Sequence, residues 1–430
     1  MAVGRENGVH ANGGQNGVGE DHIRYIPLSY DSTNSDASAL RLVFSIRPDW
    51  QDADSKVEFV RFTDGITNTL LKAVNKRPGL SKDEVDREAI LLRAYGHGTD
   101  LIIDRHRETQ NHELLMKHGL APELLARFEN GMMYRFIQGT VTQPEDLRKP
   151  DIYKAVARRL AQWHAIVPCI SGRTGHSRKT SRADGTPVTD DEFQRALDQV
   201  APGKPPPNLW TVMQKWIFAL PTDTEAQRAR QAELQQELKR LIAELSQRPG
   251  LGVNGLVFAH CDLLSGNVIV LPQSTEKAAD PTVAFIDYEY ATPSPAAFDI
   301  ANHFAEWGGF DCDFSVLPTR AQRREFIAEY IDAYFQYLEE KTPGATSQLD
   351  KQAEVERMLG EVDLYRGVPG FYWGIWALIQ ATISEINFDY ASYAEARLGE
   401  YYAWRAEVSG EREKAGREMP LRERRWAQAE

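Results

Sequence analysis

The segment HCDLLSGNVIVL, residues 260–271, is the most informative stretch of this sequence. Within it, Asp262 stands five residues before Asn267, and a short apolar run of the kind found in strands follows at once. A second apolar run, VAFI at 283–286, ends directly before Asp287. If the two runs pair as a hairpin, the strand ends that carry Asn267 and Asp287 come together. The spacing therefore predicts a carboxylate, Asp262, beside two further oxygen-bearing side chains.

This segment has the layout of a kinase catalytic loop and its metal-binding aspartate, which is H-x-D-L-x-x-x-N, then strand, loop, strand and Asp. Phosphoryl transfer needs a carboxylate that orients the attacking hydroxyl and accepts its proton, and Asp262 would supply it. Transfer also needs hard oxygen ligands for Mg²⁺, which Asn267 and Asp287 would supply. The alternative is that Asp262 only caps a turn, which the register of the other residues disfavours. His260 is expected to brace the loop through backbone hydrogen bonds, not to act as a base.

Other nucleotide and nucleophile signatures are missing. The sequence has no GxxxxGK[ST] P-loop, no complete GxGxxG and no G-x-S-x-G elbow. Cys261 has no basic neighbour in sequence and is expected to pack in the core. His164 falls on the apolar face of a predicted helix, where we expect a hydrogen-bonded core histidine without a catalytic role.

Residues 23–138 are expected to form a small, mainly antiparallel sheet with one helix, and this lobe should bind the nucleotide. Gly65, Thr67 and Asn68 lie between the first two predicted strands, where a loop over the phosphates is expected. An ordinary hairpin turn fits this position equally well. The strand-like runs are 57–62, 69–74, 89–95, 124–128 and 132–137, and the helical pattern is 102–118.

Two charged residues of this lobe are candidate nucleotide-site residues. Arg93 stands near the end of the third predicted strand, where a cation for the phosphates is expected. Glu108 lies on the following helix and would pair with Arg93, as the strand–helix ion pair of kinases does. The alternative is a surface pair that contributes less than about 1 kcal/mol.

Residues 139–430 are expected to form a larger, mostly helical lobe. Residues 1–22 are Gly- and Asn-rich and predict a disordered tail, and residues 171–207 predict a loop or insertion. The predicted helices of this lobe begin at Pro150 and span 226–247, 323–339, 347–366, 371–385 and 393–408.

Two segments of the helical lobe combine aromatic residues with carboxylates: FDIANHFAEW at 298–307 and FYWGIW at 371–376. Such a combination suits a cationic head group, through cation–π contacts of about 0.5–2 kcal/mol and ion pairing. The alternative is that Trp373 and Trp376, three residues apart, belong to a helix core. On these residues alone, the core interpretation is the stronger one.

Composition limits the class of protein. The 430 residues carry 50 Lys and Arg against 62 Asp and Glu, a net charge of −12, which argues against a general nucleic-acid binder. Three scattered cysteines without a CxxC argue against a structural zinc site and a disulfide framework. No signal peptide is visible, and the longest apolar run, 371–383, is too short to span a bilayer. We therefore expect a cytoplasmic protein without stable membrane insertion, and the sequence leaves its oligomeric state open.

With these features together, the chain resembles the choline/ethanolamine kinases, within the wider kinase-like fold of the aminoglycoside phosphotransferases. The resemblance covers residues 55–405. Its most specific motifs are HCDLLSGNVIVL (260–271), FIDYEYA (285–291) and FDIANHFAEW (298–307), and its supporting segments are 91–108, 118–139 and 371–398. It implies an α+β, two-lobed, protein-kinase-like fold with a small β-rich N-terminal lobe and a large helical C-terminal lobe.

The resemblance also implies an activity. It is ATP-dependent phosphorylation of the ethanolamine hydroxyl, the first step of the route to phosphatidylethanolamine, with ATP and Mg²⁺ as cofactors. The segments 96–108 and 388–394 look more like ethanolamine kinases than choline kinases, and a choline or dual-specificity kinase is the alternative. A kinase fold without activity and a kinase for another alcohol, such as an aminoglycoside, are the remaining rivals.

Residue roles follow from the same resemblance. Asp262 would be the catalytic base, Asn267 and Asp287 would hold Mg²⁺, and Arg93 would meet the ATP phosphates. The junction 134–137, which includes Arg135 and Ile137, would hold adenine through backbone groups. The substrate pocket would map onto Glu306, Trp373 and Trp376. The sequence departs from the family pattern at two places: Cys261 stands where many members have Asn, and TPSPAA at 292–297 replaces a more aromatic stretch.

Overall fold

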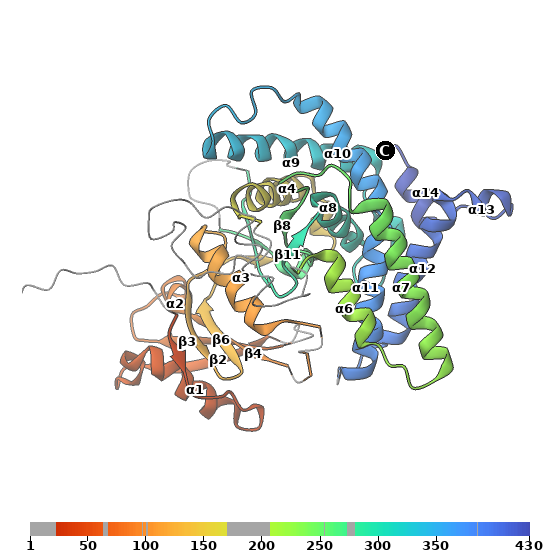
Figure 1. The fold of residues 1–430 in the computed structure, drawn as a ribbon. Coiled ribbons are helices and arrows are strands. Elements are labelled where there is room, and N and C mark those ends of the chain that lie inside the picture. The colour runs from red at the N-terminus through yellow and green to blue at the C-terminus, as the bar shows by residue number, and fades with distance from the viewer. Residues whose placement is uncertain are drawn as a thin grey trace, which may run out of the picture.

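A sheet-rich lobe lies at one end of the molecule and a larger, helical lobe at the other (Figure 1). The computed structural model describes residues 23–62, 68–96, 98–99, 102–169, 207–252, 254–272, 280–384 and 386–430. The predicted tail, 1–22, and nearly all of the predicted insertion, 171–207, lie outside the described residues.

The N-terminal lobe is built on a six-stranded sheet in the order β1-β5-β6-β4-β3-β2. All neighbouring strands are antiparallel except β1 and β5, which are parallel. Every strand predicted for this lobe is present within a few residues. The strands are β1 (Tyr25–Ile26), β2 (Lys56–Phe62), β3 (Asn68–Lys76), β4 (Ile90–Tyr95), β5 (Leu124–Phe128) and β6 (Gly131–Arg135).

The expectation of a single helix in this lobe is wrong, because α1 (Ser35–Ile46) and α2 (Lys82–Glu88) accompany α3 (Arg105–Lys117). Helix α1 buries Ala39, Leu42 and Val43 in the same core as the sheet, at the three-to-four-residue spacing of an amphipathic helix. Helix α2 buries none of its residues and is held by a capping box, so it has no apolar pattern to detect. Helix α3 starts three residues later than predicted, where the Asp104 side chain caps it.

The C-terminal lobe contains the predicted helices, extended or shortened by a few residues. Helices α6, α8, α13 and α14 were not predicted, and all are short. The helices are α4 (Pro150–Ile166), α6 (Leu209–Ala219), α7 (Glu225–Leu245), α8 (Ala296–Ala305), α9 (Arg320–Lys341), α10 (Lys351–Tyr365), α11 (Val368–Ile383), α12 (Tyr390–Val408), α13 (Glu411–Lys414) and α14 (Leu421–Ala427).

Two small sheets in this lobe carry the predicted catalytic loop. Strand β9 (Val268–Val270) pairs with β10 (Val283–Phe285) as the predicted antiparallel hairpin and with β7 (Thr140–Val141) on its other side. Strand β8 (Val257–Ala259), which precedes the loop, pairs with β11 (Thr292–Ser294). We propose that the boundary between the lobes lies near Gly139, as the sequence suggested.

Helices α11 and α12 pack in unusually close contact. A Cβ at Gly370 would lie 2.5 Å from the Arg397 carbonyl oxygen, and one at Gly374 would lie 2.6 Å from the Leu398 side chain. Only glycine permits this approach. The close contact fixes Arg397 of α12 against the helix that carries Trp373 and Trp376.

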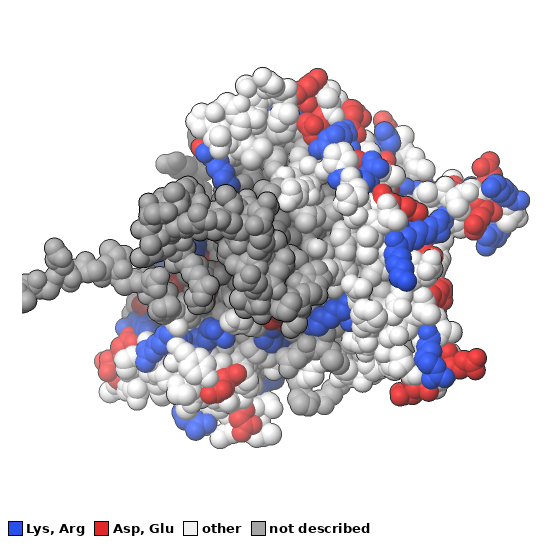
Figure 2. Space-filling model, in the orientation of Figure 1, with Lys and Arg blue, Asp and Glu red and all other residues white. Residues whose placement is uncertain are grey.

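The surface gives little sign of a polyanion-binding stripe. On the face shown in Figure 2, basic and acidic side chains are interspersed over the described part of the chain. Among the described helices, none has both the length and the apolarity needed to cross a membrane.

Candidate active site

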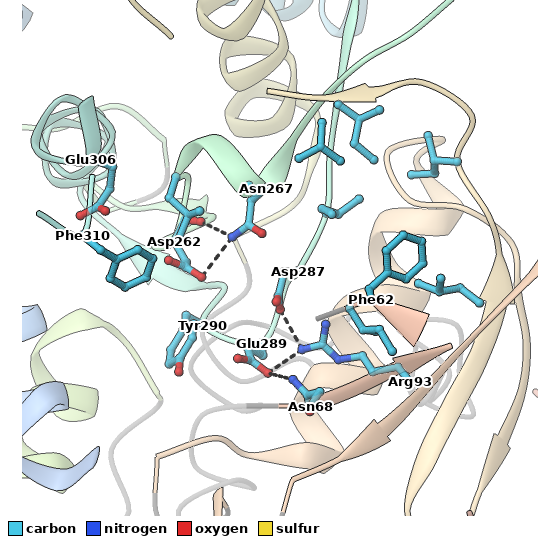
Figure 3. Close-up of a pocket in the computed structure, with 18 of the residues that line it drawn as sticks. Phe62, Asn68, Arg93, Asp262, Asn267, Asp287, Glu289, Tyr290, Glu306 and Phe310 are labelled. Carbon is cyan, nitrogen blue, oxygen red and sulfur yellow. Dashed lines mark hydrogen bonds and ion pairs between the residues drawn. The ribbon is translucent and has the colours of Figure 1, made fainter. Parts of the chain in front are cut away.

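The residues of the predicted catalytic loop lie at the floor of a cleft between the lobes, with a volume of about 260 Å³. Asp262 lines this cleft and is only 7% exposed. The Asn267 side-chain amide donates to the Asp262 carbonyl oxygen at 2.7 Å and to its carboxylate at 3.1 Å (Figure 3). The two residues that the sequence placed in register therefore hold one another in position.

The hairpin brings Asp287 to the same place. The Ile286 amide donates to the Asn267 carbonyl oxygen at 3.1 Å, so the ends of β9 and β10 are bonded as predicted. Asp287 and Cys261 both have φ of 64°, a left-handed backbone that costs energy for residues other than glycine. Strained backbone of this kind is common where a side chain must point at a ligand.

Helix α8 braces the loop from behind. The Asp299 carboxylate, fully buried, accepts hydrogen bonds from the His260 and Cys261 amides at 2.9 and 2.8 Å. Asn302 donates to the Cys261 carbonyl oxygen at 3.1 Å, and a ring nitrogen of His303 lies 2.8 Å from the Leu263 carbonyl oxygen. One helix thus holds the loop backbone at three residues, including the strained Cys261.

The two histidines make hydrogen bonds of the kind that the sequence predicted. His260 lies 3.0 Å from the Ile286 carbonyl oxygen and accepts from the Asp262 amide at 3.3 Å, so it braces the loop. Burial lowers the pKa of His260 to about 4, which keeps it neutral. His164 is buried between the Tyr330 hydroxyl, at 2.7 Å, and Asp299, at 3.0 Å.

Arg93 is the centre of a buried ion-pair cluster at the other side of the cleft (Figure 3). Its guanidinium lies 3.0 Å from Glu108, which is the predicted strand–helix pair, and this pair is buried. It also contacts Asp287 at 2.8 Å and Glu289 at 2.6 Å. Arg105 joins Glu108 and Glu289 at 3.0 and 3.2 Å. Strand β4, helix α3 and the segment after β10 thus meet in one cluster.

The wall opposite Arg93 is aromatic. Tyr290, Phe310, Trp373, Trp376 and Tyr393 line the cleft near Asp262. The indole N–H of Trp373 donates to Asn302 at 2.8 Å, and that of Trp376 donates to the Tyr290 hydroxyl at 2.8 Å. Both tryptophans are therefore nearly buried helix residues and cleft residues at once, so the two interpretations of the sequence do not exclude one another.

One carboxylate, Glu306, stands in this aromatic wall. It lines the cleft and accepts a hydrogen bond from Arg397 at 3.1 Å. Burial raises the pKa of Glu306, Arg397 opposes the rise, and Glu400 adds to it. The site therefore contains a partly neutralised carboxylate among aromatic rings.

The electrostatics of Asp262 suit a proton acceptor. Burial raises its pKa well above the usual range for aspartate, and the nearby charges of Asp287, Glu306 and Glu289 add to the effect. A carboxylate that is costly to leave ionised accepts a proton more readily. Burial also raises the pKa of the Cys261 thiol, but here the consequence is that the group stays protonated and is not a nucleophile.

The oxygens available for a metal come from Asn267 and Asp287. The side-chain nitrogen of Asn267 donates to Asp262, and no described residue donates to its side-chain oxygen, Oδ1. Among the described residues no cluster of three His, Cys, Asp or Glu side chains has the arrangement of a metal site. Such a sparse set fits Mg²⁺, which binds one or two protein oxygens and takes the rest from phosphates and water.

The remaining predicted residues are placed unequally. Gly65 and Thr67 lie outside the described residues, whereas Asn68 lines the cleft and donates to Glu289 at 3.0 Å. Ile137 also lines the cleft. Arg135 does not: its side chain pairs with Glu123 at 3.1 Å and its amide donates to the Glu123 carbonyl oxygen, so it faces away from the cleft.

Sequence reasoning missed several residues of the site. Glu289 and Tyr290 belong to the quoted FIDYEYA segment, and their closeness to Asp287 was an available signal. Phe310 left no such signal, because it comes from a loop that only the fold brings to the cleft. Tyr393 and Arg397 belong to the quoted segment 371–398, but only the packing of α12 brings Tyr393 to the cleft and Arg397 to Glu306. Asp299 and Asn302 were quoted as part of an aromatic–carboxylate cluster, but they brace the loop instead of lining the cleft.

Comparisons with known proteins agree with this geometry. The family model for choline/ethanolamine kinases matches residues 59–402. Ethanolamine kinase 2 of Mus musculus is 33% identical over 377 residues, covering 86% of this chain and 82% of that protein. Ethanolamine kinase 1 of the same organism is 32% identical over 380 residues, covering 86% and 90%.

Solved structures show the same fold. An ethanolamine kinase of Plasmodium vivax has a TM-score of 0.62 at 23% identity, covering 85% of this chain and 87% of that one. A choline kinase of Cryptosporidium parvum has a TM-score of 0.57 at 22% identity, covering 87% and 97%. These likenesses confirm the predicted two-lobed kinase-like fold. The match over 59–402 and the two mouse relatives show that this chain belongs to the choline/ethanolamine kinase family.

Proposed function

We propose that this protein transfers the γ-phosphoryl group of ATP to the hydroxyl of ethanolamine. The observation that carries the proposal is the position of Asp262, buried on the cleft floor between the Arg93 cluster and the aromatic wall with Glu306. The names of the relatives point the same way, because both mouse proteins are called ethanolamine kinases.

The Arg93 side of the cleft suits the nucleotide. Apolar side chains from both lobes, Leu70, Leu91, Phe136, Ile269 and Ile286, would enclose adenine. No described residue accepts the Ile137 N–H, which supports a backbone contact to the base. Arg93 would bind phosphate oxygens, and its present contacts with Asp287 and Glu289 show how far its guanidinium reaches.

Asn267 and Asp287 would hold Mg²⁺ with the nucleotide. When bound, the ion neutralises charge on the phosphates during transfer. The residues of the chain itself position the catalytic carboxylate. Asn267 keeps the Asp262 carboxylate in one orientation through its amide, and helix α8 fixes the loop backbone.

The aromatic side of the cleft suits a small ammonium ion. Its charge would lie against Glu306 and over the rings of Tyr290, Trp373 and Trp376. A two-carbon alcohol bound there points its hydroxyl toward Asp262. Asp262 would orient this hydroxyl and take its proton as the phosphoryl group is transferred in line.

Choline is the rival substrate. A primary ammonium offers three hydrogen-bond donors, whereas a trimethylammonium offers none. A buried carboxylate such as Glu306 is better satisfied by a donor than by methyl groups, and loss of a buried hydrogen bond discriminates strongly. This supports ethanolamine as the preferred substrate.

A coupled assay of ADP release with Mg²⁺ tests the proposal, with ethanolamine and choline compared over a range of concentrations. We expect a larger kcat/KM for ethanolamine, and phosphoethanolamine as the product. A larger kcat/KM for choline would overturn the substrate assignment and keep the kinase. Turnover of neither alcohol by folded protein that binds ATP would overturn the proposed activity.

A further inference from the structure

A line of buried ion pairs runs from Glu306 to the C-terminal helix α14. Arg397 contacts Glu306 at 3.1 Å, and its Nε lies 3.5 Å from Glu400 Oε1. The other oxygen of Glu400 lies 3.4 Å from Nε of Arg422 on α14. None of these four side chains is more than 6% exposed. Glu306 is the only one of the four that lines the cleft within the described part of the chain.

The line continues on the far side of Arg422. Arg422 donates to Glu423 at 2.8 Å, and Arg366 donates to the other oxygen of Glu423 at 3.0 Å. Charges therefore alternate along the whole line, and three carboxylates are matched by three guanidinium groups. A buried network of this kind is stable only while every charge has its partner.

Arg397 has little freedom to choose between its partners. Its backbone is pressed against Gly370 of α11, and its guanidinium lies between Glu306 and Glu400. The contact to Glu306 is a hydrogen bond, whereas those between the two arginines and Glu400 lack hydrogen-bond geometry. Charge attraction, and not hydrogen-bond geometry, therefore determines how strongly Glu400 interacts with each of Arg397 and Arg422.

Helix α14 is also docked by contacts outside this line. Arg425 donates to the Leu317 carbonyl oxygen at 2.8 Å, and Trp426 donates to Asp363 at 2.7 Å. The helix packs beside α12 (Figure 1) and lies beyond residues 59–402, the part that matches the family. Arg422 is thus brought to Glu400 by a helix that other contacts already hold.

We propose that Arg422 of the C-terminal helix is a positioning residue for the ammonium subsite: by neutralising Glu400 it leaves Arg397 to hold the Glu306 carboxylate in place and ionised. This inference rests on the proposed function, because it takes Glu306 as the carboxylate that meets the ammonium. It assigns a substrate-binding role to a segment that never touches the substrate.

Loss of Arg422 would change the charge of the subsite. Glu306 and Glu400 would then share the one guanidinium of Arg397. Since burial and Glu400 already raise the pKa of Glu306, the loss of a neutralising guanidinium would raise it further, and a proton on Glu306 would compete with the ammonium. The other titratable groups that act on Glu306 are Asp262 of the catalytic loop, Cys312 after α8 and Tyr393 of α12.

Steady-state kinetics of the full chain test the proposal. For Arg422→Gln at pH 7 we expect the KM for ethanolamine to rise on the order of tenfold, the scale of coupling within buried networks. The KM for ATP and kcat should stay within about twofold of wild type. The ratio of the variant's ethanolamine KM to that of wild type should fall as the pH is raised from about 6.5 to 8.5, because the competing proton is lost.

Two further variants separate positioning from stability. Arg422→Lys keeps the charge and should restore most of the affinity. Adding Glu400→Gln to Arg422→Gln removes the unmatched carboxylate, so the double variant should have a lower ethanolamine KM than Arg422→Gln. A purely structural role predicts the reverse, because the second change removes a further buried partner. Arg425→Gln, on the same helix, is the matched control and should leave every constant near wild type.

Different results would overturn the positioning role of Arg422 and the proposed kinase activity. Turnover by wild type with an unchanged ethanolamine KM in Arg422→Gln would overturn this inference alone. A parallel loss in both substrates, also seen in Arg425→Gln, would do the same, because it would indicate general destabilisation. Absence of wild-type turnover would overturn the proposed function and this inference with it. If Arg422→Gln fails to fold, the double variant decides: a near-normal KM supports the role, and a raised KM refutes it.

Discussion

Two buried arginines contact carboxylates of the cleft, and the ion-pair clusters around these arginines are assembled in different ways. Arg93 reaches from the N-terminal sheet to Asp287 and Glu289 after β10, so its cluster joins two lobes. Arg397 contacts Glu306 and Glu400 inside the C-terminal lobe alone. The nucleotide side therefore depends on how the lobes are placed, whereas the alcohol side is assembled within one packed unit.

The charge balance of the two clusters differs as well. Around Arg93, the described residues place three carboxylates (Glu108, Asp287 and Glu289) against two guanidinium groups, one carboxylate more than guanidinium groups. Around Arg397, the line to Arg366 is balanced. An excess carboxylate at the nucleotide side leaves room for a cation, and a balanced alcohol side favours a fixed pocket.

The largest expected effect lies between the two clusters. Asp262→Asn removes the proposed base and should lower kcat by about 10²- to 10⁴-fold, the usual contribution of general-base catalysis. Coupled assays at saturating substrates measure it, with circular dichroism as the control for folding. Turnover near wild type would show that Asp262 is not the catalytic base. The two clusters could then not be compared as the two sides of a site centred on Asp262.

Breaking the Arg93 cluster should harm only the nucleotide side. Arg93→Met is expected to lower kcat/KM for ATP by about 10²- to 10³-fold, the scale of removing one preorganised charge contact. Arg93→Lys should recover only part, because an ammonium cannot bridge Glu108, Asp287 and Glu289 as a guanidinium does. If the KM for ethanolamine rose instead, the division into two sides would be wrong.

Glu306→Gln is the matching change on the alcohol side. It removes the negative charge and keeps the size, so the KM for ethanolamine should rise about 10- to 100-fold, as expected for a lost charge-assisted hydrogen bond. The KM for ATP should not change. A smaller effect on ethanolamine than on choline would indicate that the carboxylate does not meet the ammonium.

Asp262 should also limit stability. Its folded-state pKa is raised, so the protonated form favours the native state at low pH, and this stabilisation is lost as the pH rises through the folded pKa. The amide that replaces the carboxyl in Asp262→Asn cannot ionise. The Tm of this variant should therefore exceed that of wild type by a margin that grows as the pH rises from about 4, the unfolded value for aspartate, through the folded pKa. Thermal unfolding measured at several pH values checks this, and a margin that shrank with rising pH would contradict it.

The smallest effect is expected at Arg135. Its side chain pairs with Glu123, which is 62% exposed, away from the cleft. Exposed pairs contribute about 0–1 kcal/mol, so Arg135→Gln should change kcat and both KM values by less than about twofold. A clear rise in the KM for ATP would place this side chain in the nucleotide site after all.

The sequence predicted the parts of the site that are local in the chain. Asp262 and Asn267 are five residues apart, and the β9–β10 hairpin joins Asn267 to Asp287, so spacing and strand pattern sufficed. The Arg93–Glu108 pair was also predicted, by analogy with the strand–helix ion pair of kinases, and it is buried instead of lying on the surface. Helix α2 was missed because it is short, is held by its capping box and has no apolar pattern. Helix α1 was missed although its buried residues have amphipathic spacing, and the residues of α8 were interpreted as an aromatic–carboxylate segment.

What the sequence by itself determined is therefore the family, the catalytic loop and the order of most strands and helices. Tertiary structure alone decided which residues support them: Arg135 turns outward, Asp299 braces the loop, and Arg397 meets Glu306. The Glu400–Arg422 contact joins segments that no spacing relates. The physical reason is that local hydrogen-bond and apolar patterns are written along the chain, whereas the pairing of buried charges depends on which helices pack together.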